Sequence, residues 1–245
     1  KLPLPPLPEQ QRIVAILQKA DRLRRLRRYA RRLSDTYLQS VFLEMFGDPW
    51  INPNKWDKST IGRLCEVKTG GTPRRDMPEH YNGVIPWIKT TEVVNNIIYS
   101  TEEHISVQGM KNSNCELFPI DTIVIAMYGQ GLTRGRTAKL GIRATTNQAC
   151  AAILPSTKIE PDFLWIYLKM SYSKLRDLGR GGNQPNLNLS MIRDFPVITP
   201  SQSKQKDFLF IQGSFEKINT RQLESERQAE LLFQTLLHRA FQGDL

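Results

Sequence analysis

The stretch Leu2-Pro-Leu-Pro-Pro-Leu-Pro-Glu-Gln-Gln-Arg-Ile-Val-Ala-Ile-Leu17 decides the fold, because it joins a proline-broken extended run to a long amphipathic helix. Proline fixes φ and lacks a backbone donor, so the helix can begin only at or just after Pro8. This first arm ends at Phe46-Gly47-Asp48. A second segment with the same pattern starts at Phe195-Pro196-Val197-Ile198-Thr199-Pro200 and ends at Phe241-Gln-Gly-Asp244. The repeat separates two helical arms from a central block.

Each arm carries a stripe of mainly apolar or small residues at helical spacing, which in the second arm keeps the 3.5-residue period of a coiled-coil seam. The first stripe consists of Ile16, Ala20, Leu23, Leu26, Ala30, Leu33, Tyr37 and Val41. The second consists of Phe208, Ile211, Phe215, Ile218, Gln222, Ser225, Ala229, Leu232 and Leu236.

A single arm would leave its stripe exposed, so the two are expected to pack together. Because a globular block joins the end of one to the start of the other, we predict an antiparallel, coiled-coil-like pair of residues 9–46 and 202–242. In this pair Leu23, Leu26 and Leu33 should face the middle of the second arm. The arginine-rich run at 22–32 could then oppose Glu216, Glu224, Glu226 and Glu230, although solvated charged faces are the alternative.

Composition narrows the class of protein. The chain has 245 residues, 40% of them hydrophobic, and a formal net charge of +10, which favours a polyanionic partner. Its three cysteines are far apart and no Cys/His cluster occurs, so the sequence predicts no metal site and a reducing cytoplasm. No signal peptide and no run of 18 apolar residues is present, which indicates a soluble, intracellular protein with no membrane partner.

The central block alternates short β-branched or aromatic runs with Gly, Pro, Asn and Thr. Strands are expected at 83–89, 122–127 and 149–154, and a short helix at 162–174 after Pro161. The predicted fold class is therefore α+β, with a mixed-sheet domain flanked by two long helices. We place the domains at 1–48 (proline entry and first helix), 49–200 (mixed-sheet domain) and 201–245 (second helix).

Motifs for independent catalysis or for a cofactor are missing from the sequence. It has no GxxxxGK[ST] phosphate loop, and Gly129-Gln-Gly131 continues to Arg134 where a dinucleotide fingerprint needs glycine. His80, His104 and His238 are isolated from any nucleophile in sequence. We therefore predict a noncatalytic chain without a cofactor.

Four loops of the central block combine glycine with hydroxyl, amide and guanidinium groups, which can bind phosphates and base edges. Each loop alone is more typical of an ordinary turn, but four in one basic domain favour DNA binding. The candidate DNA-binding residues are Thr69, Gly70, Gly71, Thr72, Arg74, Arg75, Lys89, Tyr128, Gln130, Arg134, Arg136, Thr146, Asn147, Gln148, Arg180, Asn183, Gln184 and Asn186.

The order of several motifs resembles the specificity subunit of type I restriction-modification enzymes over essentially the whole chain. The arm from Pro5-Pro-Leu-Pro-Glu-Gln-Gln-Arg-Ile-Val14 to Leu43-Glu-Met-Phe-Gly-Asp-Pro49 is similar to that family's central conserved region. The block between the arms resembles its target recognition domain through Thr69-Gly-Gly-Thr-Pro73, Ile85-Pro-Trp-Ile88, Met127-Tyr-Gly129, Ala144-Thr-Thr-Asn-Gln-Ala149 and Asn186-Leu-Asn-Leu-Ser190. The second arm departs from the family's entry motif, with Pro200-Ser-Gln-Ser-Lys.

Members of that family usually carry two recognition domains, so the chain is expected to be the C-terminal half of such a subunit or a natural half-length form. The resemblance implies a chain that reads one half of a bipartite target in double-stranded DNA and docks methyltransferase (modification) and restriction subunits, which hold the catalytic activity. A half-length form could pair as a homodimer. Two alternatives stay open: a structural coiled-coil adaptor, and a nuclease or methyltransferase whose site the sequence does not reveal.

Overall fold

Both predicted arms are helices in the computed structural model, which describes residues 5–129, 131–179 and 186–245. Helix α1 spans Leu7–Phe46 and helix α7 spans Gln202–Gln242. Helix α1 thus begins one residue before the predicted start, because Pro8 in its first turn needs no intrahelical partner for a backbone N–H. Within the described ranges no helix is both long and apolar enough to cross a membrane.

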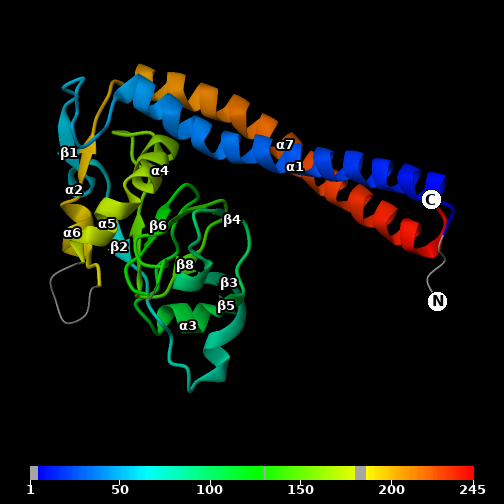
Figure 1. The fold of residues 1–245 in the computed structure, drawn as a ribbon. Helices are drawn as coiled ribbons and strands as arrows, with labels where there is room; N and C mark the ends of the chain where they lie inside the picture. Colours follow the sequence, from blue (N-terminus) through cyan, green and yellow to red (C-terminus); the bar gives the residue numbers. More distant parts are fainter. Residues whose placement is uncertain (1–4, 130, 180–185) are drawn as a thin grey trace. The chain divides into compact units, whose positions relative to one another are not determined.

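The chain forms two compact units, residues 1–45 with 208–245 (the helical unit) and residues 46–207 (the globular unit). In the helical unit α1 and α7 lie side by side, and the start of α1 is at the same end as the end of α7 (Figure 1). The pair is held by Arg24–Glu230 (3.3 Å), Arg31–Glu226 (3.2 Å), stacked Tyr37–Phe215 rings (5.2 Å between centroids) and edge-on Phe42–Phe208 rings (5.5 Å). Residue numbers rise on one helix as they fall on the other, so the predicted antiparallel pairing is confirmed.

The seam of α7 follows the predicted stripe at one position of each heptad and departs from it at Ile218 and Leu232 in the other. Phe208 and Ala229 are buried as predicted, but Ile218 and Leu232 are 51% and 46% exposed and Gln212 is buried instead. Residues three or four positions apart on a helix share a face. A seven-residue repeat can therefore consist of a step of three followed by a step of four, or of a step of four followed by a step of three. In α7 the step of four comes first, which places Gln212 in the seam. The prediction that Ile218 and Leu232 are seam residues is wrong.

The middle of α1 meets α7 through arginines. Leu23, Leu26 and Leu33 are 39%, 54% and 53% exposed, so this leucine stripe is not buried in the pair. Leu33 nevertheless faces the second arm as predicted, because it lines an apolar groove with Phe215 and Ile218. Arg24 instead lies over the Phe233 ring, 4.1 Å from its centroid. Arg24, Arg28 and Arg31 reach across the pair to the carboxylates of Glu226 and Glu230.

The globular unit contains short strands and helices, and the predicted strands at 83–89, 122–127 and 149–154 appear as β3, β6 and β9. The strands are β1 (Lys58–Thr60), β2 (Val67–Thr69), β3 (Tyr81–Ile88), β4 (Ile97–Ile98), β5 (Glu103–Ile105), β6 (Ile123–Ala126), β7 (Thr137–Leu140), β8 (Thr145–Thr146), β9 (Cys150–Ile153) and β10 (Pro196–Ile198). The α-helices are α2 (Ile61–Leu64), α3 (Val107–Lys111), α4 (Pro161–Met170), α5 (Tyr172–Leu178) and α6 (Leu189–Arg193), and 3₁₀ turns occupy Pro78–His80 and Thr90–Glu92. The single helix predicted at 162–174 is two helices, α4 and α5, separated at Ser171.

The strands form three sheets, in the orders β2-β9-β6-β7-β4, β5-β3-β8 and β1-β10. The first two contain both parallel and antiparallel pairs: β4 runs parallel to β7 and β8 parallel to β3, whereas β9 is antiparallel to both β2 and β6. The α+β class with mixed sheets is confirmed.

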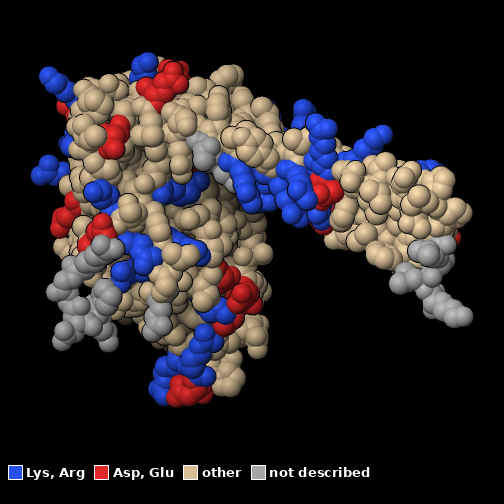
Figure 2. All heavy atoms as spheres, in the orientation of Figure 1, with Lys and Arg blue, Asp and Glu red and all other residues tan. Residues whose placement is uncertain are grey.

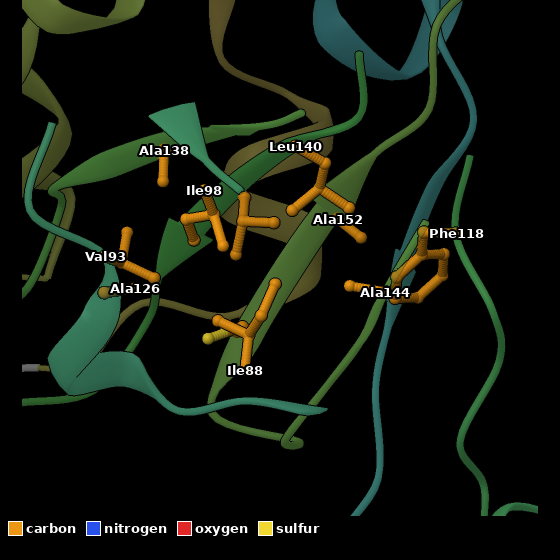
Figure 3. Close-up of a cluster of buried hydrophobic side chains, with 11 residues drawn as sticks. Ile88, Val93, Ile98, Phe118, Ala126, Ala138, Leu140, Ala144 and Ala152 are labelled. Atoms are coloured by element: carbon orange, nitrogen blue, oxygen red, sulfur yellow. The ribbon is translucent and has the colours of Figure 1, made fainter. Parts of the chain in front are cut away.

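The five-stranded sheet is buried on both faces, so β6, β7 and β9 are continuous runs of buried residues. On one face Trp165 of α4 donates its indole N–H to the Thr137 hydroxyl at 3.1 Å. On the other face, Ala138 and Leu140 join the cluster around Ile88 and Phe118 (Figure 3). Small alanines on these strands allow close packing, which makes the sheet a rigid base for the loops at its ends.

Candidate nucleic-acid interface

Sheet topology brings the predicted loops to one edge of the five-stranded sheet. Strand β9 runs antiparallel to β2, pairing Thr69 with Ala151, and to β6, pairing Ala126 with Cys150. The chain therefore leaves β2 and β6, and enters β9, at the same edge. The loop between β6 and β7 lies at this edge as well, because those two strands are antiparallel neighbours.

The fourth predicted stretch joins the same edge through backbone hydrogen bonds. The N–H of Leu187 donates to the Met127 carbonyl at 3.0 Å, and the Met127 N–H donates to the Ala149 carbonyl at 2.9 Å. Half-buried Asn186 is adjacent to this junction. The other predicted residues of these stretches, Gln130, Arg180, Asn183 and Gln184, lie outside the described part of the chain.

Gly70 and Gly71 bring two of the loops together by close backbone approach. The Gly71 N–H donates to the Thr146 carbonyl at 2.9 Å. A Cβ on Gly70 would lie 1.8 Å from that carbonyl oxygen, so any side chain there would clash with backbone. Thr146 is itself fully buried. These three residues shape the loops, and a direct DNA contact by them stays a prediction.

Hydroxyl and amide groups add a second layer of contacts between the same loops. The Thr69 hydroxyl donates to the Cys150 carbonyl at 3.0 Å and lies 3.2 Å from the Gln148 carbonyl, and the Thr72 hydroxyl hydrogen-bonds the Gln148 side chain. The Asn147 side-chain oxygen accepts from the Ala149 N–H at 3.2 Å and closes the turn before β9. Thr72 and Gln148 are exposed, so their polar groups are accessible to a ligand.

The two adjacent arginines of the first loop are held in different ways. Arg74 is 70% exposed in its side chain and pairs with Asp76 through two hydrogen bonds, at 2.6 and 3.1 Å. Arg75 donates from Nη1 to Glu103 Oε2 at 2.7 Å, and its Cζ lies 4.6 Å from the Tyr81 ring centroid and 4.9 Å from that of Trp87.

Glu103 is the acidic centre of this cluster. It accepts from Arg75 and from the Lys89 ammonium, whose Nζ is 3.0 Å from Glu103 Oε1 and 2.7 Å from Glu102. These two cations, Arg75 first, lower the pKa of the Glu103 carboxyl. Lys89, predicted as a DNA contact, thus forms ion pairs with two carboxylates, and its side chain is only 27% exposed.

Sequence inspection missed the aromatic partners of this arginine. The Tyr81 hydroxyl donates to the Pro73 carbonyl at 2.6 Å, and the Trp87 indole N–H donates to the Gly71 carbonyl at 2.9 Å. The two rings therefore fix the loop backbone as well as the guanidinium. The motif Ile85-Pro-Trp-Ile88 contained a signal for the hydrogen bond to Gly71, because a tryptophan in a buried strand needs an acceptor for its N–H, but it does not indicate the contacts with Arg75.

The loop between β6 and β7 places its candidates at different depths. Tyr128 is 43% exposed, Arg134 is 8% exposed, and Arg136 is half-buried. Gly129 and Gly135 have φ of +135° and +82°, values that favour glycine, and these positions turn the chain sharply. The Tyr172 hydroxyl of α5 supports the loop by donating to the Leu132 carbonyl at 2.6 Å.

Charge is distributed over both units, and half of the chain's net +10 belongs to residues 46–207. Figure 2 shows Lys and Arg side chains in several patches on one face of the globular unit, with carboxylates beside them. Within the described residues, no group of three His, Cys, Asp or Glu is arranged to hold a metal ion. The edge thus offers guanidinium, hydroxyl and amide donors on a rigid sheet, an arrangement suited to a polyanion with readable base edges.

Comparison with known proteins identifies the family. A family model described as type I restriction modification DNA specificity domain matches residues 53–232. The chain belongs to this family.

Three similar proteins illustrate the relationship. The type I restriction enzyme HindI specificity subunit of Haemophilus influenzae is 28% identical over 200 residues, which cover 79% of this chain and 42% of the relative. The MjaIX specificity subunit of Methanocaldococcus jannaschii is 26% identical over 171 residues, covering 68% and 39%. The HsdS subunit from Thermoanaerobacter tengcongensis, a solved structure, has a TM-score of 0.64 at 20% identity and covers all of this chain and 60% of its own. The matches thus span less than half the length of the two curated relatives.

Proposed function

We propose that this chain is a noncatalytic specificity component of a type I restriction-modification system, which reads one half of a bipartite target in double-stranded DNA. The observation that carries the proposal is the convergence of the candidate loops, with Arg74 and Arg75, at one edge of a rigid sheet. Loops on a rigid scaffold can change their base contacts without disturbing the core. Residues 49–200 are the proposed recognition domain, and the predicted DNA-binding residues are its proposed contacts.

The helical pair is the proposed spacer and docking surface for modification and restriction subunits. A helix of 40 residues spans about 60 Å, enough to set the distance between two recognition domains. An apolar groove of about 480 Å³ along the pair, lined in part by Leu33, Tyr37, Phe215 and Ile218, supports an attached partner helix. Methyl transfer and cleavage are assigned to the partner subunits. A half-length form would act as a homodimer, which supplies two recognition domains.

The decisive experiment is a domain exchange. Residues 49–200 would be replaced by the equivalent block of another such subunit, and the modified DNA motif would be determined by methylome sequencing in a host that carries the modification subunit. We expect one half of the methylated motif to change while assembly survives. An unchanged motif would refute the assignment of this block as the reader.

A matched change in the helical unit tests the division of roles. Ile218→Asp introduces a charge into the apolar groove at a residue that is 51% exposed, so the pair itself should still form. We expect the variant to lose the modification subunit in a pull-down. The methylated DNA motif should be unchanged in any complex that still forms.

A further inference from the structure

We infer that Arg75 is a base-reading side chain of this domain, that it pairs with a guanine, and that Glu103, Tyr81 and Trp87 are the residues that position it. The inference rests on the proposed function and adds to it a specific residue and a specific base. No sequence motif distinguishes Arg75 from Arg74. The distinction comes from the surroundings that the fold gives to each.

The guanidinium of Arg75 is oriented by three residues from two strands. Tyr81 and Trp87 belong to β3 and Glu103 to β5, which pair as antiparallel neighbours with Trp87 opposite Glu103. Trp87 is 2% exposed, so its ring is a fixed base rather than a mobile surface group. Because the carboxylate holds Nη1 and the rings contact the guanidinium, its orientation is set before any ligand arrives.

The geometry leaves a hydrogen-bonding edge of Arg75 available. Its side chain is 54% exposed, although the Trp87 ring that it contacts is buried and the Tyr81 ring is half-buried. Within the described part of the chain, Nη1 is the only nitrogen of the Arg75 guanidinium with a hydrogen-bond partner, the Glu103 carboxylate. The edge formed by Nε and Nη2 is therefore available to a ligand. An arginine edge with two parallel N–H groups matches O6 and N7 of guanine in the major groove.

Preorganisation separates Arg75 from its neighbour. Among the described residues Arg74 pairs with Asp76, two residues away in its own loop, and has no aromatic contact, so no neighbouring strand fixes its position. A side chain that is already held loses less conformational freedom on binding, and its geometry discriminates between bases. Arg74 therefore fits a phosphate contact, which carries no sequence information.

The first test replaces the planar fork and keeps the charge. The full chain and its Arg75→Lys variant would each be incubated with a library of double-stranded oligonucleotides with randomised positions, and the bound DNA would be sequenced. We expect the variant to lose roughly 5- to 100-fold of preference at a single G·C pair, with the other positions of the motif unchanged. Arg143→Lys is the control, because Arg143 is an exposed arginine in the loop that follows β7, at the opposite edge of the sheet, and should leave every position unchanged.

The second test addresses positioning. Glu103→Gln keeps an oxygen acceptor but removes the charge that holds Arg75, whereas Glu102→Gln removes an equal charge that contacts Lys89 and not Arg75. Both variants remove a negative charge near DNA and should bind random DNA somewhat more tightly. Only Glu103→Gln should also weaken the preference at the G·C pair that Arg75→Lys affects. A purely structural Glu103 would lower the melting temperature without changing the motif.

The outcomes distinguish this inference from the proposed function. If the unchanged chain selects no sequence at all, the proposed function fails and the inference with it. If the unchanged chain selects a motif that Arg75→Lys leaves intact at every position, only the inference about Arg75 is overturned. A motif changed by Arg75→Lys but not by Glu103→Gln overturns the positioning role.

Discussion

Replacing Phe208 by alanine tests the packing of the helical unit most directly. The Phe208 side chain is fully buried, and its ring meets the Phe42 ring edge-on with 5.5 Å between centroids. Removing a buried phenylalanine costs about 3–5 kcal/mol, because apolar burial is lost and a cavity remains. About 0.5–1.5 kcal/mol of this belongs to the aromatic pair itself. For a chain of this size, 3 kcal/mol corresponds to a fall of about 6–12 °C in melting temperature.

Phe210 provides the matched control, since it lies two residues further along the same helix and is 79% exposed. Phe210→Ala should change the free energy of unfolding by no more than about 0.5 kcal/mol. Both variants would be measured by urea denaturation followed by far-ultraviolet circular dichroism. A double-mutant cycle with Phe42→Ala would isolate the coupling between the two rings.

Two results would refute the proposed packing. If Phe208→Ala and Phe210→Ala destabilise equally, the face of α7 that meets α1 is not the one described. If Phe42→Ala and Phe208→Ala are simply additive, the two rings are not in contact across the pair, and the antiparallel register fails at this end.

Three further outcomes follow from the contacts of single residues. Gly70→Ala should destabilise the chain by about 1–3 kcal/mol in thermal unfolding, because its Cβ would meet the Thr146 carbonyl at 1.8 Å, whereas Gly213→Ala, with open space around its Cβ, should stabilise it by about 0.4–1 kcal/mol. The lowered pKa of Glu103 stabilises the fold above the ordinary pKa of about 4.3, and this stability is lost as pH falls through the folded value, so the difference in unfolding free energy between wild type and Glu103→Gln should shrink in acid. Glu226→Gln should lower the free energy of unfolding, measured by urea denaturation, by less than about 1 kcal/mol. In 1 M salt this difference should vanish, because salt screens exposed ion pairs between the helices.

Parts of the candidate site could be found in the sequence and parts could not. The loops at 69–75, 128–136 and 146–148 were identifiable, since glycine beside hydroxyl and guanidinium groups indicates turns that can bind a polyanion. Their convergence was not identifiable, because it depends on β9 pairing antiparallel with both β2 and β6. The burial of Arg134 likewise depends on what the fold packs around its loop.

The amino-acid sequence alone determined the two long helices and their antiparallel pairing. Proline sterics and helical periodicity are local properties of the chain, and the central block that joins the end of one helix to the start of the other favours their antiparallel direction. Only the tertiary structure decided which set of heptad positions forms the seam, since Ile218 and Gln212 fit the period equally well and only packing against a partner chooses between them. The same holds for Arg75, whose partner Glu103 is 28 residues away and reaches it only when β3 pairs with β5. Electrostatic and aromatic contacts act over a few ångströms in space, so a function that depends on them is specified by the fold rather than by any short stretch of sequence.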